Sequence, residues 1–149
     1  MQLTGSHVLQ APVSRIWTLL MDTDMLARVV PGITRLEQVS ENQYNAIADI
    51  KIGPVSGSFS GSLSLGDIRE NEGYTLHVKQ NSKIGNADAV VKISLKAIDD
   101  AQTELSFDGD ARLSGLLART GNRVISGVAN TLTKQFFNNV EEELKNSHL

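Results

Sequence analysis

A strict alternation of side-chain types over residues 55–65 constrains the fold of this 149-residue chain more than any other feature. Serine occupies every even-numbered position, and apolar or small residues occupy the odd-numbered positions Val55, Gly57, Phe59, Gly61, Leu63 and Leu65. Successive side chains of a β-strand point to opposite faces of its sheet. The segment is therefore predicted to be a strand with one buried face and one solvated face.

The same two-residue period recurs along most of the chain. It appears over residues 44–52, 74–78, 87–97 and 105–113, and a shorter strand is predicted over about residues 2–9. Gly53-Pro54 predicts a hairpin turn, and further turn signals lie at residues 70–73, 83–86 and 99–102. Such short connections make consecutive strands antiparallel neighbours.

Helical spacing replaces the alternation in two regions. Apolar residues between Val13 and Leu20 predict a short helix, and Asp22 is expected to cap a second short helix that ends at Pro31-Gly32. From Gly115 to about Asn146 one amphipathic pattern predicts a single helix of roughly 30 residues and about 45 Å. Its apolar stripe comprises Leu117, Gly121, Val124, Val128, Leu132, Phe136, Val140 and Leu144.

These elements predict one α+β domain over residues 1–149. Its expected architecture is a curved antiparallel sheet of six to seven strands wrapped around a long C-terminal helix, with two short helices after the first strand. This arrangement gives the apolar face of the sheet and the apolar stripe of the helix a common partner.

The composition excludes several classes of protein. The chain has no cysteine, which rules out thiolate metal sites, iron–sulfur clusters and cysteine catalysis. A formal net charge of −3 without any basic run argues against nucleic-acid binding. No stretch approaches the ~18 consecutive apolar residues of a membrane span, and the N-terminus lacks a signal-peptide pattern. We therefore expect a cytoplasmic protein.

Small residues dominate the predicted inward face of the sheet. They are Ala46, Ala48, Gly57, Gly61, Ala87, Ala89, Gly109 and Ala111. A fully packed interior would need bulky partners for them, yet the chain has only four Phe, two Tyr and one Trp. One interpretation is a cavity between sheet and helix that suits an apolar small molecule. The alternative is that Gly and Ala let the sheet bend and bring the helix backbone close to it.

Four segments, taken in order, resemble a known family. They are Leu3-Thr4-Gly5-Ser6 with Ala11-Pro12 and Ile16-Trp17; Leu26-Ala27-Arg28 leading to Pro31-Gly32; Ile52-Gly53-Pro54-Val55 with Gly57, Phe59 and Gly61; and Gly115, Leu117-Ala118, Gly121, Arg123, Gly127 and Gln135-Phe136-Phe137. The chain resembles the START-like (SRPBCC, Bet v 1-like) helix-grip superfamily, and within it the CoxG family of carbon monoxide dehydrogenase subunits.

The resemblance implies an accessory role without catalysis. Members of the family accompany molybdenum hydroxylases of the carbon monoxide dehydrogenase type. They would bring that enzyme to the membrane or move a hydrophobic electron acceptor between the two. The expected partners are therefore such a hydroxylase complex, a hydrophobic small molecule such as a quinone or lipid, and transient contact with the inner face of the cell membrane. No metal or covalent cofactor is expected.

The fold and the resemblance together define two sets of candidate site residues. The predicted cavity lining comprises Trp17, Ala46, Ala48, Ile50, Phe59, Gly61, Leu63, Tyr74, Leu76, Ala89, Val91, Phe107, Gly109, Leu117, Val124, Val128, Leu132 and Phe136. The predicted cavity mouth, where a partner or membrane would dock, comprises Pro31, Gly32, Leu116, Arg119, Gly121 and Arg123. Arg119 and Arg123 are four apart on a helix, so they would form a cationic lip, or simply two solvated side chains.

No constellation of catalytic residues stands out. His7, His77 and His148 lack the spacing of a zinc pair. Asp108 and Asp110 share the outward face of their strand, where Lys92 or Lys96 could lie across from them.

The alternative is an enzyme of the polyketide cyclase or hydrolase type. It would require an inward ionisable group with a perturbed pKa. The alternation places only Tyr44, Tyr74 and Gln80 as polar groups on the inner face.

Overall fold

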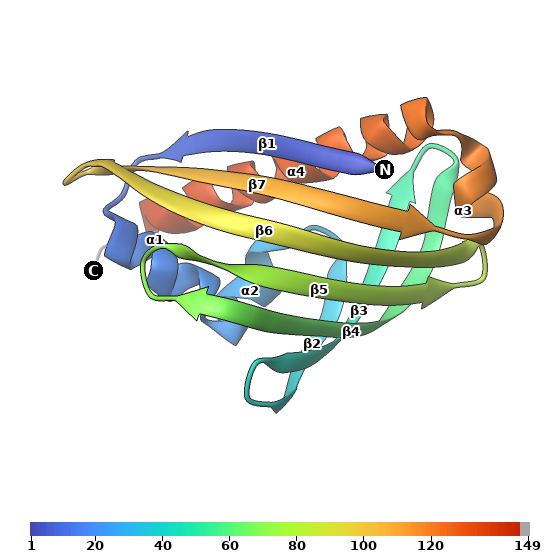
Figure 1. Cartoon of the computed structure of the whole chain (residues 1–149), viewed down its shortest axis with the longest axis horizontal. Coiled ribbons are helices and arrows are strands. Elements are labelled where there is room, and N and C mark those ends of the chain that lie inside the picture. The colour runs from blue at the N-terminus through green and yellow to red at the C-terminus, as the bar shows by residue number, and fades with distance from the viewer. Residues whose placement is uncertain (147–149) are drawn as a thin grey trace.

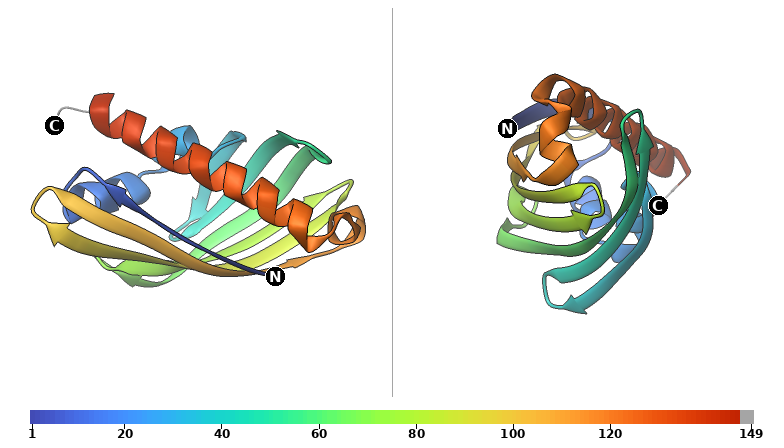
Figure 2. Two further views of the ribbon diagram at one scale, coloured as in Figure 1. Left: turned by 90° about the horizontal axis from the view of Figure 1, so that it is seen from above. Right: turned by 90° about the vertical axis from the view of Figure 1, so that its right-hand side faces the viewer.

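The computed structural model describes residues 1–146 and contains one seven-stranded antiparallel sheet with a long helix across its concave face (Figure 1, Figure 2). This confirms the predicted α+β class and architecture. The strand order in the sheet is β1-β7-β6-β5-β4-β3-β2. The elements in chain order are β1 (Gln2–Leu9), α1 (Val13–Leu20), α2 (Thr23–Val29), β2 (Ile33–Ser40), β3 (Gln43–Ile52), β4 (Val55–Arg69), β5 (Gly73–Ser82), β6 (Gly85–Asp99), β7 (Gln102–Leu113), α3 (Gly115–Thr120) and α4 (Asn122–Asn146).

The register of the strands follows the predicted alternation. The β3–β4 hairpin turns at Gly53-Pro54, with Ile52 opposite Val55, and Gly53 adopts a φ of 54°. Along β4, Val55 and Phe59 are buried whereas the serines at positions 56, 58, 60 and 62 are exposed. Strand β1 pairs with β7, so the two ends of the strand region lie side by side (Figure 1).

The edge strand β2 was not predicted as a strand of its own. Only Ile33 and Leu36 are half-buried in it, and the remaining six residues are exposed. Its pairing with β3 also shifts register at two places. An edge strand with two apolar contacts and broken register carries no two-residue period in its sequence, which is why the pattern failed there.

The two short helices form where expected. The Asp22 carboxylate caps α2 by accepting hydrogen bonds from the backbone N–H groups of Asp24 (2.9 Å) and Met25 (3.2 Å). Pro12 is the N-cap of α1, one position before the predicted first turn. After α2, Gly32 adopts a φ of +81° and packs so tightly that a Cβ there would lie 2.7 Å from the Asp49 carbonyl oxygen.

The predicted single helix over residues 115–146 is wrong, because it is broken at Gly121 into α3 and α4. Gly121 adopts φ 100° and ψ 146°, a combination that is open essentially to glycine alone. Its carbonyl oxygen accepts the first hydrogen bond of α4 from the Ile125 N–H (3.1 Å). The 25 residues of α4 span about 37 Å, so the length expected of the C-terminal helix is shared between two helices.

The buried side chains form two separate clusters. The first joins α1, the C-terminal half of α4 and one end of the sheet, with Trp17, Leu105 and Val140 among its members. The second, at the other end, consists of Val55, Phe59, Leu117 and Val128. The core is therefore split, and the middle of α4 lies between its two parts.

Two glycines near the helix break should respond oppositely to alanine. At Gly121 a Cβ has free space, but its positive φ strains any other residue, so Gly121→Ala should lower the free energy of unfolding by about 1–3 kcal/mol. Gly127 lies inside α4 with equally free space, so Gly127→Ala should raise it by up to about 1 kcal/mol. Urea unfolding of both variants provides the measurement. Stabilisation by Gly121→Ala would show that the break is not a fixed feature.

Candidate ligand-binding site

An apolar hollow of about 320 Å³ lies between the middle of α4 and strands β5 to β7. Helix α1, the loop between α2 and β2, the three strands and α4 all contribute to its wall. The lining residues are Leu20, Val30, Pro31, Tyr74, Val91, Ile93, Leu105, Phe107, Leu132, Thr133 and Phe136. Its volume lies within the range of ligand pockets, roughly 300–1,000 Å³.

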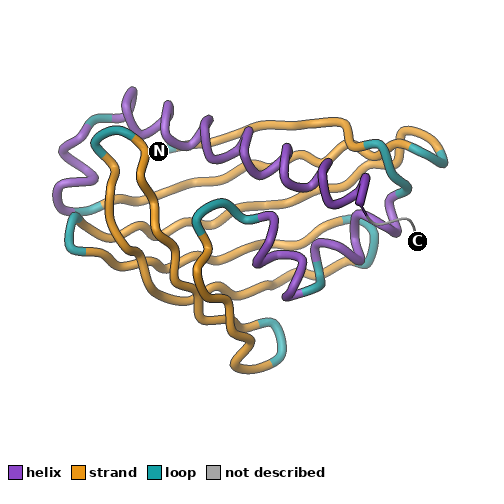
Figure 3. Tube along the Cα trace, turned by 180° about the vertical axis from the view of Figure 1, so that it is seen from behind, coloured by secondary structure: helices purple, strands orange, loops and turns teal. Residues whose placement is uncertain are grey.

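The hollow exists because α4 stands away from the central strands. The backbone of α4 comes close to α2, α3 and β1, and these contacts lie toward its ends and one edge of the sheet (Figure 3). Beneath its middle the inner face carries small residues such as Ala89 and Gly109. Ala89 and Val91 stay half-buried although they face inward. The side chains here are too short to close the space.

The lining carries no charge. Among its residues only Tyr74 and Thr133 are polar, and the Thr133 hydroxyl already donates a hydrogen bond to the Ala129 carbonyl oxygen (2.8 Å). Burial raises the pKa of the Tyr74 phenol from 10.0 to about 12, and the nearby Tyr44 adds to the shift. Trp17 meets the Tyr74 ring edge-on, with ring centroids 6.0 Å apart. The site therefore suits a neutral, apolar molecule.

Gln80 is the unusual polar residue of the inner face. It lies on β5 between Gly61 of β4 and Ala87 of β6. Both polar atoms of its amide are shielded from solvent, and neither has a hydrogen-bond partner among residues 1–146. A buried polar group without a partner typically costs about 1–3 kcal/mol.

Five residues of the predicted cavity lining do line the hollow: Tyr74, Val91, Phe107, Leu132 and Phe136. Pro31, predicted at the mouth, joins them. The prediction missed Leu20, Val30, Ile93, Leu105 and Thr133. Ile93 and Leu105 could have been found, because the strand alternation already placed them inward. Val30 and Thr133 carried no signal, since they lie outside the periodic stripes.

The remaining predicted lining residues lie elsewhere. Trp17 belongs to the first core cluster; Phe59, Leu117 and Val128 form the second together with Val55, and Ile50 packs against it. Buried Ala46 and Gly109 and half-buried Ala48, Gly61, Leu63, Leu76 and Ala89 lie on strands β3 to β7. Val124 was predicted inward but is 38% exposed. Because the chain breaks at Gly121, Ile125 takes the inward position and packs against the second cluster.

The predicted mouth is divided in the structure. Pro31 borders the hollow beside Leu132, whereas Arg123 lies nine residues earlier along α4, about 14 Å away along the helix axis. Gly32 follows Pro31 in the loop, and Gly121 forms the break between α3 and α4. The other predicted mouth residues gather at that break. We call Leu116, Arg119, Arg123 and Val124 the junction patch.

All four residues of the junction patch are exposed, with Leu116 56% exposed. Neither Arg119 nor Arg123 has an ion-pair partner among residues 1–146. The patch therefore combines two cations that these residues leave unpaired with two exposed apolar side chains.

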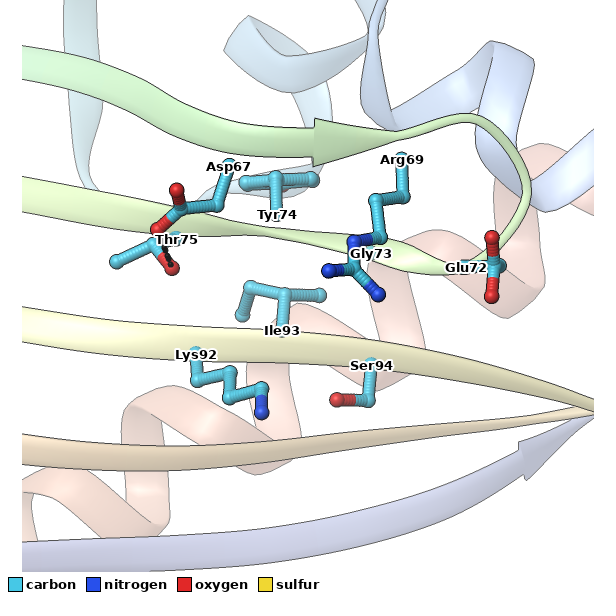
Figure 4. Close-up of a pocket in the computed structure, with 9 residues that line it drawn as sticks. All are labelled: Asp67, Arg69, Glu72, Gly73, Tyr74, Thr75, Lys92, Ile93 and Ser94. Carbon is cyan, nitrogen blue, oxygen red and sulfur yellow. Dashed lines mark hydrogen bonds between the residues drawn. The ribbon is translucent and has the colours of Figure 1, made fainter.

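A larger hollow, about 500 Å³, lies on the outer face of the sheet (Figure 4). Asp67, Arg69, Glu72, Thr75 and Lys92 border it, so its charges are of both signs. The Thr75 hydroxyl donates to the Asp67 carboxylate (3.3 Å). These side chains point away from α4, into solvent (Figure 4). Its mixed charge makes it a poorer site for an apolar ligand than the hollow under α4.

The carboxylates that might have suggested catalysis have surface partners. Asp108 lies opposite Lys92 in the register, as expected, but its carboxylate accepts a hydrogen bond from the Gln2 amide (3.0 Å). Asp110 pairs with the amino group of Met1 (3.3 Å). Lys96 lies opposite Glu104, and not opposite either aspartate.

The histidines do not meet one another. His77 is exposed, and His148 lies outside the described residues. His7 contacts the Glu141 carboxylate of α4 and stacks on Phe137, with ring centroids 4.7 Å apart. Within residues 1–146 no three His, Cys, Asp or Glu side chains gather in a way that could hold a metal ion.

The architecture is that of the START superfamily. A START-superfamily protein from Mycobacterium smegmatis superposes with a TM-score of 0.74 at 13% identity, and the match covers 97% of each chain. The ZhuI aromatase/cyclase from Streptomyces sp. R1128 gives a TM-score of 0.73 at 12% identity, covering 97% of this chain and 93% of that chain. At such identities the likeness shows the fold alone.

Two further matches define the family. The model of CoxG, a family of carbon monoxide dehydrogenase subunits, matches residues 5–145. A conserved protein from Geobacillus kaustophilus has a TM-score of 0.95 at 31% identity, covering 100% of this chain and 98% of that chain. The chain belongs to the CoxG family of carbon monoxide dehydrogenase subunits. A comparison with curated proteins finds no significant match.

One finding bears on the expected membrane contact. Within the part of the chain that the structure describes, no helix is both long and apolar enough to cross a membrane.

Burial of Tyr74 should make stability depend on pH at the alkaline end. Between pH 10 and pH 12 the folded chain keeps a phenol proton that the unfolded chain loses, so rising pH favours unfolding. The loss through this group should reach roughly 3 kcal/mol. Urea unfolding at successive pH values should show this loss in the unmodified chain and a smaller one in Tyr74→Phe. Equal losses in both proteins would contradict the burial of the phenol.

Proposed function

We propose that the chain is a non-catalytic accessory protein that carries a neutral apolar molecule, such as a quinone or lipid, in the hollow under α4. It would serve a molybdenum hydroxylase of the carbon monoxide dehydrogenase type, by delivering an electron acceptor or by recruiting the enzyme to the membrane. The observation that carries the proposal is the uncharged lining of the hollow. Carriage involves no chemical step on this chain.

Membership of the family supports the accessory role, because the family is named for a subunit of carbon monoxide dehydrogenase. Solved structures with the same fold include an aromatase/cyclase, so an enzyme remains the alternative. The chemistry of the lining favours a carrier. Its one ionisable group is Tyr74, and a pKa of about 12 keeps that phenol protonated at neutral pH. A protonated phenol can donate a hydrogen bond but cannot act as a general base.

The junction patch supports contact with an anionic surface. Its two arginines, which have no ion-pair partner among the described residues, lie next to two exposed apolar side chains. Such a patch combines electrostatic attraction with shallow insertion into a bilayer interface. A surface of the same chemistry on a partner enzyme would satisfy the patch equally.

Filling the hollow should abolish carriage without unfolding the chain. Thr133→Phe places an aromatic ring against the hollow, whereas Thr131→Phe makes the same change at an exposed position of α4. Both threonines donate to a helix carbonyl oxygen, to that of Ala129 (2.8 Å) and that of Gly127 (3.1 Å), so the two changes are matched. We expect Thr133→Phe to weaken binding of geranyl naphthoquinone at least tenfold, and Thr131→Phe to leave it unchanged.

Quenching of Trp17 reports this binding, because the chain has a single tryptophan and that residue contacts Tyr74 at the hollow. Unchanged affinity in Thr133→Phe would place the ligand elsewhere, and no binding by the unmodified chain would refute the carrier function.

Reversing the junction patch should separate docking from ligand binding. The variant Arg119→Glu with Arg123→Glu should bind vesicles of phosphatidylglycerol and phosphatidylcholine at least tenfold more weakly in dilute salt, because each basic residue contributes about 1 kcal/mol at such a surface. Lys79→Glu with Lys92→Glu makes the same charge change on the outer face of the sheet. Vesicle sedimentation measures both variants. Equal losses would mean that net charge, and not the patch, governs the contact.

A further inference from the structure

The position of Gln80 on β5 raises the question of what its amide does. Tyr74, Leu76, Val78 and Gln80 share the inner face of this strand, whereas the alternate residues His77, Lys79 and Asn81 are exposed. Glutamine is the only amide on the inner face, and it stands where the alternation calls for an apolar side chain.

Nothing beside Gln80 can satisfy its amide. In the cross-strand row its neighbours are Gly61 and Ala87, and Ala46 lies beyond Gly61. None of these side chains can form a hydrogen bond. A Cβ at Gly61 would lie 1.8 Å from the Lys79 carbonyl oxygen and 3.1 Å from the Cα of Gln80, so the gap cannot hold a larger residue.

Gln80 does not take part in an internal polar network either. Tyr74 is six residues away along the strand, roughly 20 Å. Neither Nε2 nor Oε1 of Gln80 has a partner among residues 1–146. Buried amides of native proteins are normally hydrogen-bonded, and an exception calls for an explanation.

The inner face connects Gln80 to the hollow. Ala87, beside Gln80, is followed on the same face of β6 by Ala89 and then by Val91, which lines the hollow. The distance from Ala87 to Val91 along the strand is roughly 13 Å. An elongated molecule with its body in the hollow could therefore reach the amide across these small residues.

We propose that Gln80 is the polar anchor of the carried ligand, and that the ligand is a neutral molecule with an apolar body and a carbonyl or hydroxyl group at one end. This rests on the carrier function proposed above. The amide Nε2 donates to a carbonyl oxygen, and the amide Oε1 accepts from a hydroxyl. The same side chain thus holds either form of such a group. A carboxylate or phosphate head is disfavoured, because the inward positions of β3 to β7 carry no cation.

The test compares two probes that differ only in their carbonyl groups, geranyl naphthoquinone and geranyl naphthalene. Gln80→Met replaces the amide by an apolar chain of similar length, and Gln80→Leu is a second apolar replacement. Gln38→Met makes the same change on the exposed face of β2. Equilibrium dialysis gives the dissociation constants, and thermal melting shows whether each variant folds.

We expect Gln80→Met to bind the naphthoquinone about tenfold more weakly and the naphthalene as tightly as the unmodified chain, as for the loss of one hydrogen bond. Gln38→Met should bind both probes normally. Both Gln80 variants should fold, since they lose an amide that has no partner among the described residues.

Three outcomes would overturn the inference. Unchanged naphthoquinone binding in Gln80→Met would show that the amide does not touch the ligand. Equal weakening for both probes would assign it a role in shape alone. Failure of both variants to fold would assign it to the fold. If the unmodified chain binds neither probe, the carrier function itself fails, which is a different result.

Discussion

One helix cannot cover the apolar face of a seven-stranded sheet, and the rest of the structure follows from this mismatch. Seven strands spaced about 4.8 Å apart span roughly 29 Å, whereas a helix with its side chains is about 10–12 Å across. Helices α1 and α2 cover part of the remainder at one end of the sheet (Figure 3). The curvature of the sheet brings more of the inner face toward α4 (Figure 2). What is still uncovered is the hollow.

Polar contacts hold α4 over this gap instead of letting it sink into the sheet. Toward its C-terminus, the Arg15 guanidinium donates to the Leu144 carbonyl oxygen (2.7 Å), and the Asn139 amide donates to that of Val29 (3.1 Å). At the other end α3 is tied to the β5–β6 turn, where the Leu117 N–H donates to the Ile84 carbonyl oxygen (2.9 Å). A helix fixed at both ends over small residues leaves space beneath its middle, and that space has the size and polarity of a ligand site.

Sequence periodicity predicted the sheet, the two short helices and the hairpin at Gly53-Pro54, because each depends on local alternation or capping. It failed where local pattern and tertiary geometry disagree. Gly121 fits the helical stripe, yet its positive φ breaks the helix and turns Val124 outward. The small inward residues correctly predicted unfilled space, but its position depends on how α4 crosses the sheet. Pro31 and the junction patch were expected at one mouth and lie apart for the same reason. That Gln80 lacks a partner among the described residues depends on side chains from three strands.

The central claim is that a neutral apolar ligand binds between α4 and the sheet, and a two-dimensional amide NMR titration with geranyl naphthoquinone tests it most directly. The account predicts that the shifts concentrate at Tyr74, Val91, Phe107 and Leu132, which border the hollow. Shifts centred instead on Asp67, Arg69 and Thr75 of the outer groove, or no shifts at all, would contradict it.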